Sequence, residues 1–248
     1  MDRSALLART SLRLFAATWL ATVPLGLADA ASPPNLPHTT ARLAVGAGLR
    51  ISAFGSSSTE GIGASSPAAT YPSRLAAELS SLLPETHITV LNRGVSGEDV
   101  DDMMRRLPAI LAERPDLVIW QTGSNDALRN VPIERFVAMT REGIAAVRAA
   151  GADIILMEPQ LCRTLDAKQG SETFRDAIRA IGAELGVPVV RRYDLMQAWI
   201  NRGLVTRARM MSGDGLHMGD AGYELLATEV AHEIVAETIP SSRIGAAR

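Results

Sequence analysis

Short apolar runs alternate with longer amphipathic segments from Arg50 almost to the end of the chain. The short runs have the length of strands that are buried on both faces. The first of them stops at Gly55, where a turn of small polar residues follows. Five strands are therefore expected, at residues 51–54, 88–91, 117–120, 154–157 and 187–190.

The longer segments carry apolar residues at the spacing of one helix face. Proline suits the first turn of a helix and glycine its end, so Pro72 and Gly151 help to place two boundaries. Helices are expected over roughly 72–83, 98–113, 132–150, 174–185, 195–201 and 221–237.

Alternating strands and helices predict a parallel sheet covered by helices on both faces, a three-layer α/β/α sandwich. Right-handed connections, and a proline at position 188 that suits an edge strand, favour the flavodoxin-like strand order 2-1-3-4-5. That order places a crevice beside the first strand, flanked by the loops after the second and third strands. The loops around this crevice are where reactive groups are expected.

Composition narrows the classes of function. The 248 residues, 47% of them hydrophobic, suffice for one domain with a substantial core. A net charge of −2 and a pI near 6.1 give no basic surface for nucleic acid. The single cysteine, Cys162, excludes an internal disulfide and a cysteine-based zinc site. We find no dinucleotide, phosphate-loop or metalloprotease motif, so neither a cofactor nor a metal is expected.

The first residues have the pattern of a targeting segment. Three arginines precede an apolar run over Leu14–Ala28, and Ala28–Ala30 fits an A-x-A cleavage site. We predict a signal peptide over residues 1–30 and a protein exported to a bacterial periplasm or beyond, with an uncleaved anchor as the alternative. A flexible leader is expected over residues 31–48 and a disordered tail over 241–248.

Candidate chemistry begins with Ser57, which follows the first strand in a turn of small residues. A serine there can be presented to solvent with its backbone N–H free to bind an anion. Near the other end, Asp214 and His217 stand three residues apart, directly before the last predicted helix. Histidine is the usual base for a serine nucleophile, and a carboxylate can hold its second ring nitrogen. The order Ser, Asp, His along the chain is that of hydrolases built on α/β sheets.

At these residues the chain resembles the SGNH (GDSL-type) hydrolases. Four motifs occur in the order of that family, on loops that match, and the resemblance covers roughly residues 50–238; we therefore expect a hydrolase domain over 49–240. The motifs are Gly55–Gly61, which is similar to GDSxTxG, then Asn92-x-Gly94, Gly123-x-Asn125-Asp126 and Asp214-x-x-His217.

The resemblance implies a role for each matching residue. Ser57 would be the nucleophile, His217 the base and Asp214 the residue that orients it. The oxyanion hole would consist of the backbone N–H groups of Ser57 and Gly94 and the side-chain amide of Asn125. The implied activity is hydrolysis of small acyl esters through an acyl-enzyme, with no cofactor.

One position departs from the family pattern, because Ser56 stands where aspartate is usual. The change leaves the nucleophile in place but puts the hydrogen bonds of the turn in question. Ser57 is preferred over Ser56 and Ser58 because only Ser57 lies two residues before Thr59, as the motif requires.

Two other functions stay open. An acyltransferase, or a deacetylase acting on carbohydrate, would use the same residues. A ligand-binding module of the same fold would use none of them chemically, and each residue has an ordinary structural role available. Serines, asparagines and aspartates commonly bond to backbone groups of turns, and glycines commonly serve a positive φ.

Overall fold

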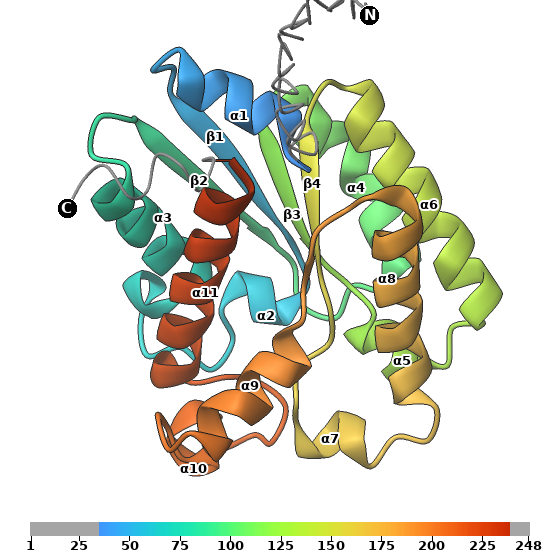
Figure 1. Ribbon diagram of the computed structural model, residues 1–248. Helices are drawn as coiled ribbons and strands as arrows, with labels where there is room; N and C mark the ends of the chain where they lie inside the picture. The colour runs from blue at the N-terminus through green and yellow to red at the C-terminus, as the bar shows by residue number, and fades with distance from the viewer. Residues whose placement is uncertain (1–34, 239–248) are drawn as a thin grey trace, which may run out of the picture. The chain divides into compact units, whose positions relative to one another are not determined.

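The computed structural model describes residues 35–238. Its centre is a five-stranded sheet in which every neighbouring pair is parallel and the order is β2-β1-β3-β4-β5 (Figure 1). The predicted strand order is therefore confirmed. The strands are β1 (Leu49–Gly55), β2 (Ile88–Gly94), β3 (Leu117–Gln121), β4 (Asp153–Met157) and β5 (Val189–Val190).

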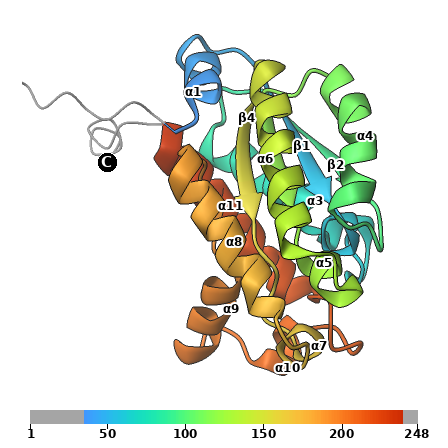
Figure 2. The ribbon, with the colours of Figure 1, turned by 90° about the vertical axis from the view of Figure 1, so that its right-hand side faces the viewer.

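Helices lie on both faces of the sheet, as the views in Figures 1 and 2 show. The longer ones are α1 (Pro37–Ala44), α3 (Tyr71–Leu82), α4 (Val100–Ala112), α6 (Ile133–Ala149), α8 (Ser171–Leu185), α9 (Arg192–Asn201) and α11 (Asp220–Thr238). The short ones are α2 (Ser57–Glu60), α5 (Ser124–Arg129), α7 (Arg163–Asp166), α10 (Arg207–Met210) and a 3₁₀ turn over Pro67–Ala69.

The side chains of each strand alternate between two buried clusters, as the period of a strand requires. In β3, Leu117 and Ile119 join the cluster formed with α3, α9 and α11. Val118 and Trp120 join the cluster formed with α4, α6 and α8. Both faces of the sheet are covered, which is why its strands read as continuous apolar runs rather than as alternating ones. The predicted three-layer sandwich is confirmed.

The flexible leader predicted up to residue 48 is wrong where the structure describes it. Residues Pro37–Ala44 form helix α1, and the side chain of Leu36 before it is fully buried. The carboxylate of Asp153 accepts hydrogen bonds from the backbone N–H groups of His38 (3.3 Å) and Thr39 (2.6 Å). An acid at the N-terminus of a helix satisfies N–H groups that have no partner within the helix. This contact joins residues more than a hundred positions apart, so the local composition did not show it.

Several boundaries differ from those expected, and strand β5 and helices α4 and α9 begin two or three residues away from the predicted positions. Strand β2 runs to Gly94 rather than ending at residue 91, because its register with β1 continues to the pair Gly55 and Gly94. The segment after β3 is not a plain loop but begins helix α5. The predicted signal peptide and tail lie outside the described residues. Within 35–238, no helix has both the length and the apolar character needed to cross a bilayer.

Candidate active site

The carboxyl ends of β1, β2 and β3 carry three of the four motifs. Ser57 is the first residue of the short helix α2, which follows β1 after a single residue. The loop after β2 leads to α4, and Asn125 lies in α5 directly after β3. The strand order therefore brings these three loops together at the carboxyl-terminal end of the sheet, as expected for an open parallel sheet.

The fourth motif lies on the loop between α10 and α11 and reaches the same end of the sheet. The Nε2 atom of His217 lies 2.8 Å from Ser57 Oγ. The other ring nitrogen, Nδ1, lies 2.5 Å from Oδ2 of Asp214. The three residues predicted for proton transfer thus form one hydrogen-bonded chain, in the order that a serine nucleophile requires. The side chain of His217 is 12% exposed, whereas that of Asp214 is 42% exposed.

Asp214 is held by bonds from its own loop. Its Oδ1 atom accepts hydrogen bonds from Ser212 Oγ (2.7 Å) and from the N–H groups of Leu216 and His217 (both 2.9 Å). Partial burial alone would raise the pKa of Asp214, but the bonds from the N–H and ring of His217, from Ser212 and from Leu216 hold that pKa well below its usual range. The carboxylate is therefore ionised at any pH near neutrality.

Gln121 supplies the hydrogen bonds of the serine turn. These were the bonds in question because Ser56 stands where the family usually has aspartate. This residue ends β3 and is fully buried. Its Oε1 atom accepts hydrogen bonds from Ser56 N–H (3.0 Å), Ser56 Oγ (3.1 Å) and Thr59 Oγ1 (3.2 Å). Ser56 and Ser58 are buried, and of the three serines only Ser57 contacts His217. Sequence reasoning missed Gln121, because a polar residue at a strand end carries no distinctive spacing.

Two of the three predicted oxyanion donors have an N–H that can face a substrate. Within residues 35–238, the backbone N–H of Ser57 has no acceptor. The next N–H groups along the turn that do have one are those of Thr59 and Glu60, and both donate to Ser56 O. Asn125 donates one amide hydrogen from Nδ2 to the carbonyl of Glu98 (2.7 Å). A side-chain amide has two such hydrogens, so this bond leaves one and fixes its direction.

The third predicted donor, Gly94, does not have a free N–H. Its N–H donates to Oδ1 of Asn92 (3.0 Å), and a Cβ at this position would lie 2.0 Å from the nitrogen of Glu60. Glycine is required here because the end of β2 passes against α2. Three residues later, Gly97 has φ +80° and an N–H that finds no acceptor in the described part of the chain. With its N–H already bonded to Asn92, Gly94 is poorly placed to donate to an oxyanion, and Gly97 is the alternative candidate for that role.

Asp126, the last residue of the third motif, has a structural role. Its carboxylate is fully buried and accepts hydrogen bonds from the N–H groups of Val100 (2.8 Å) and Gly123 (3.1 Å). Burial raises the pKa of Asp126 to about 6. These bonds join the start of α4 to the start of α5, which carries Asn125.

A cavity of about 440 Å³ borders the loop that holds Asp214. It lies between α7 and α10, and Ser212, whose hydroxyl bonds to Asp214, is one of its walls. Its remaining lining is Arg163, Arg207, Ala208, Met211, Gly213 and Gly215. No group of three or more His, Cys, Asp or Glu side chains in residues 35–238 is arranged to hold a metal ion.

A parallel sheet in the order 2-1-3-4-5, with a serine after the first strand and Asp-x-x-His before the last helix, defines the SGNH type of hydrolase. The chain belongs to the non-GDSL lipase-like family, whose model matches residues 21–237. This match confirms the resemblance inferred from the four motifs.

Curated relatives support the same class. An arylesterase of Vibrio mimicus is 27% identical over 162 residues, which are 62% of this chain and 77% of the relative. Thioesterase 1/protease 1/lysophospholipase L1 of Escherichia coli K12 is 24% identical over 60% of this chain and 69% of its own. With the family match, these relatives support the predicted enzyme class, a carboxylic ester hydrolase.

Solved structures share the fold. An acetylxylan esterase, Axe2 of Geobacillus stearothermophilus, superposes with a TM-score of 0.65 at 23% identity, covering 79% of this chain and 99% of that structure. A two-domain esterase (CEX) active on acetylated mannans gives a TM-score of 0.68 at 19% identity, covering 84% of this chain. This chain spans about half of that two-domain structure, 54% of its length.

Proposed function

We propose that the protein is an exported serine esterase that hydrolyses small acyl esters through Ser57, His217 and Asp214. The observation that carries the proposal is the continuous hydrogen-bonded chain from Ser57 Oγ through both ring nitrogens of His217 to Asp214. Each contact is within the distance that proton transfer requires. A binding module of the same fold would have no need of this alignment.

The proposed reaction uses the contacts among these three residues. Nε2 of His217 takes the proton of Ser57 Oγ as that oxygen attacks the ester carbonyl, and Asp214 stabilises the imidazolium that forms. The oxygen of the tetrahedral intermediate accepts hydrogen bonds from the N–H groups of Ser57 and Gly97 and from the second amide hydrogen of Asn125. His217 then protonates the departing alcohol. Water, deprotonated by the same histidine, then attacks the carbonyl of the acyl-enzyme. As the bond from Ser57 Oγ to the acyl group breaks, His217 returns the proton to Oγ and the acid is released.

The second candidate keeps this site and changes the substrate: a carbohydrate deacetylase, or an acyltransferase that uses a sugar hydroxyl in place of water. The names of two fold neighbours, an acetylxylan esterase and an esterase active on acetylated mannans, favour testing acetylated sugars first.

Labelling with a fluorophosphonate tests the nucleophile. We expect one covalent adduct, mapped by mass spectrometry to Ser57, and none in Ser57→Ala. An adduct on Ser56 or Ser58 would contradict the assignment, and no adduct at all would favour the binding module.

Substrate panels test the reaction. We expect p-nitrophenyl acetate to be hydrolysed faster than esters of longer acyl chains. Release of acetate from acetylated xylooligosaccharides would favour the deacetylase, and an acylated product that forms only with a sugar acceptor would favour the transferase.

The proposal of export rests on the charge and apolar pattern of residues 1–30. Expression of the full chain in a bacterial host, followed by fractionation and N-terminal sequencing, tests it. We expect the mature protein outside the cytoplasm and beginning at Ala31. Retention of Met1 in a cytoplasmic product would contradict export.

A further inference from the structure

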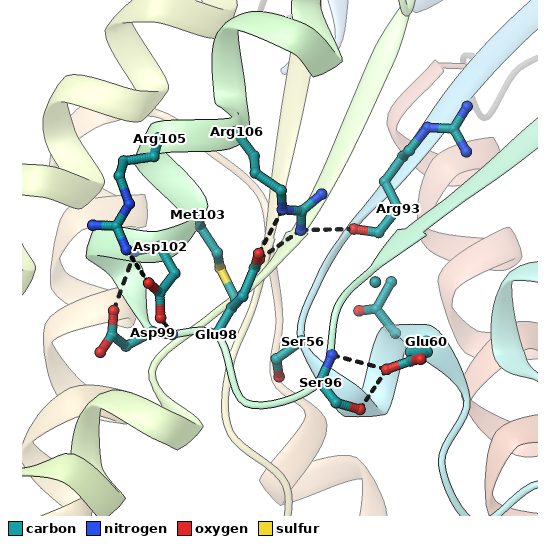
Figure 3. Close-up of polar contacts among 12 residues, drawn as sticks. Ser56, Glu60, Arg93, Ser96, Glu98, Asp99, Asp102, Met103, Arg105 and Arg106 are labelled. Atoms are coloured by element: carbon teal, nitrogen blue, oxygen red, sulfur yellow. Dashed lines mark hydrogen bonds and ion pairs between the residues drawn. The ribbon is translucent and has the colours of Figure 1, made fainter.

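The loop of residues 95–99 joins β2 to α4 and is fastened from two sides (Figure 3). On one side, the carboxylate of Glu60 in α2 accepts hydrogen bonds from the N–H (2.8 Å) and the hydroxyl of Ser96. On the other, Glu98 faces Arg106 of α4. The loop contains Gly97, and it also contains the carbonyl to which Asn125 is bonded.

Glu98 makes two contacts, one through its side-chain carboxylate and one through its backbone carbonyl. Its carboxylate receives a two-pronged bond from Arg106, with Nε–Oε1 at 2.7 Å and Nη2–Oε2 at 2.6 Å. The two side chains are 12% and 27% exposed, so the pair is largely shielded from water. Its backbone carbonyl accepts the amide of Asn125 at 2.7 Å. The residue that directs Asn125 is thus itself held by a fork-shaped ion pair, the most directional kind.

Arg106 in turn contacts both strands that lead into the site. Its Nη2 atom donates to the carbonyl of Arg93 in β2 at 3.1 Å. Its guanidinium carbon lies 5.1 Å from the ring centroid of Phe54, three residues before Ser57 in β1. The guanidinium therefore fixes the position of Glu98 relative to the strands that present the serine.

We propose that Arg106 and Glu98 are positioning residues for the oxyanion donor Asn125. The inference rests on the proposed function, since it concerns how that donor is aimed. The terminal torsion of an asparagine side chain is soft, so an amide left alone would sample many directions. A donor contributes most when it already points to where negative charge develops. The bond to the Glu98 carbonyl fixes one amide hydrogen and so aims the other, provided that the carbonyl itself cannot move.

The first test compares neighbouring arginines of α4. Arg106→Met removes the ion pair with Glu98. Arg105→Met is the matched control, because Arg105 is 69% exposed and pairs with Asp102 instead. With p-nitrophenyl acetate we expect Arg106→Met to lose about 10-fold in kcat with little change in KM, less than removal of an oxyanion donor itself. Arg105→Met should retain the kcat of the wild type, and equal losses in both variants would overturn the inference.

The second test is a double-mutant cycle with Asn125→Ala, which separates positioning from general damage to the fold. If Arg106 acts through Asn125, then Arg106→Met should cost less than about 2-fold once the amide is absent. An undiminished cost in the Asn125→Ala background would overturn the inference while leaving the proposed function standing. Full kcat in Asn125→Ala alone would also overturn the inference, because Asn125 would then not be an oxyanion donor, while the esterase activity itself would stand.

Two further variants keep the cycle interpretable. Arg106→Lys retains the charge but cannot form the fork, so we expect only partial recovery of kcat relative to Arg106→Met. Glu98→Gln retains the carbonyl that Asn125 uses and weakens only the pair, and it replaces Arg106→Met in the cycle if that variant does not fold. A Glu98→Gln enzyme with the kcat of the wild type would count against the proposal.

Discussion

The two halves of the site are built in different ways. The half that would move protons lies mostly within one loop and is called the local half: Asp214 is held by Ser212, Leu216 and His217, all within three residues of it, and only Ser57 comes from elsewhere in the chain. The half that would receive the oxyanion, the assembled half, depends on three elements. Asn125 comes from α5, and it is fixed by Glu98 of the loop after β2, which Arg106 of α4 holds in place.

This difference determines how each half responds to mutation. In the local half, Ser57, His217 and Asp214 would take part in the reaction themselves, so a change at any of these three should act on the chemistry directly. In the assembled half, the donors are few but their supports are many, so a distant change can weaken catalysis without touching the substrate. Effects of mutations should therefore be large and confined in the first half, and smaller and coupled in the second.

The largest expected effect is that of the nucleophile. Ser57→Ala should lose on the order of 10⁶ in kcat, by analogy with another serine hydrolase. Ser58→Ala is the matched control, since Ser58 is buried and lies one residue further along α2. Steady-state hydrolysis of p-nitrophenyl acetate measures both, and a comparable loss in Ser58→Ala would argue against Ser57.

Asp214→Asn should follow, with a loss of about 10⁴ in kcat, the cost of the equivalent change in another serine hydrolase. The neutral amide no longer stabilises the imidazolium and can hold the ring in the wrong tautomer. Ser212→Ala removes only one of the bonds to Asp214 and should cost far less. Similar losses in the two variants would mean that the whole loop, rather than the carboxylate, matters.

In the assembled half, Asn125→Ala should lose about 10²–10³ in kcat, the typical cost of one oxyanion donor. KM should change little, because the hydrogen bond strengthens mainly in the transition state. Parallel kcat and KM measurements, with circular dichroism to verify folding, decide the outcome. A variant that folds and keeps full kcat would remove Asn125 from the site.

The pH dependence reports on the local half alone. The low pKa of Asp214 keeps its carboxylate ionised, so its protonation does not contribute near neutrality. His217 must be neutral to accept the serine proton, and kcat/KM should therefore fall once acid protonates the ring. Rates measured from pH 8 to pH 5 test this, and a flat profile would count against a histidine base.

The sequence was sufficient for the local features and insufficient for the distant ones. The Asp214 and His217 motif is visible because three-residue spacing lies within one loop. The strands follow from local periodicity, and their order from the handedness of the connections and the proline at position 188. Gly94 is predicted as an oxyanion donor from its motif alone, and the sequence does not show that its N–H already has an acceptor. That acceptor, the side chain of Asn92, is known only from the folded chain.

Long-range contacts account for the other omissions. The segment around α1 has the composition of a mobile leader, yet Asp153 fixes its first turn. Gln121 is 65 positions from Ser56, and no spacing rule connects them. In each case the missing information was a partner brought close by the fold rather than a property of the segment itself.

The smallest effect on rate is expected at Ser56, where the chain departs from the GDSxTxG motif. Restoring the aspartate, Ser56→Asp, would place a buried carboxylate against Gln121 Oε1, so two acceptors would face each other. In the wild type, Oε1 of Gln121 accepts the N–H of residue 56. If the Gln121 amide rotates so that its Nε2 donates to the new carboxylate, Oε1 turns away and that N–H loses its acceptor. We expect Ser56→Asp to lose about 1–3 kcal/mol of unfolding free energy, the cost of an unsatisfied buried polar group. The kcat of the folded enzyme should change only a few-fold, since Ser57 and His217 keep their places.

Ser56→Ala, which loses one hydroxyl and keeps the N–H bond, is the control and should be the more stable of the two in urea unfolding. If Ser56→Asp proves more stable than the wild type, Gln121 does not take over the role of the missing aspartate.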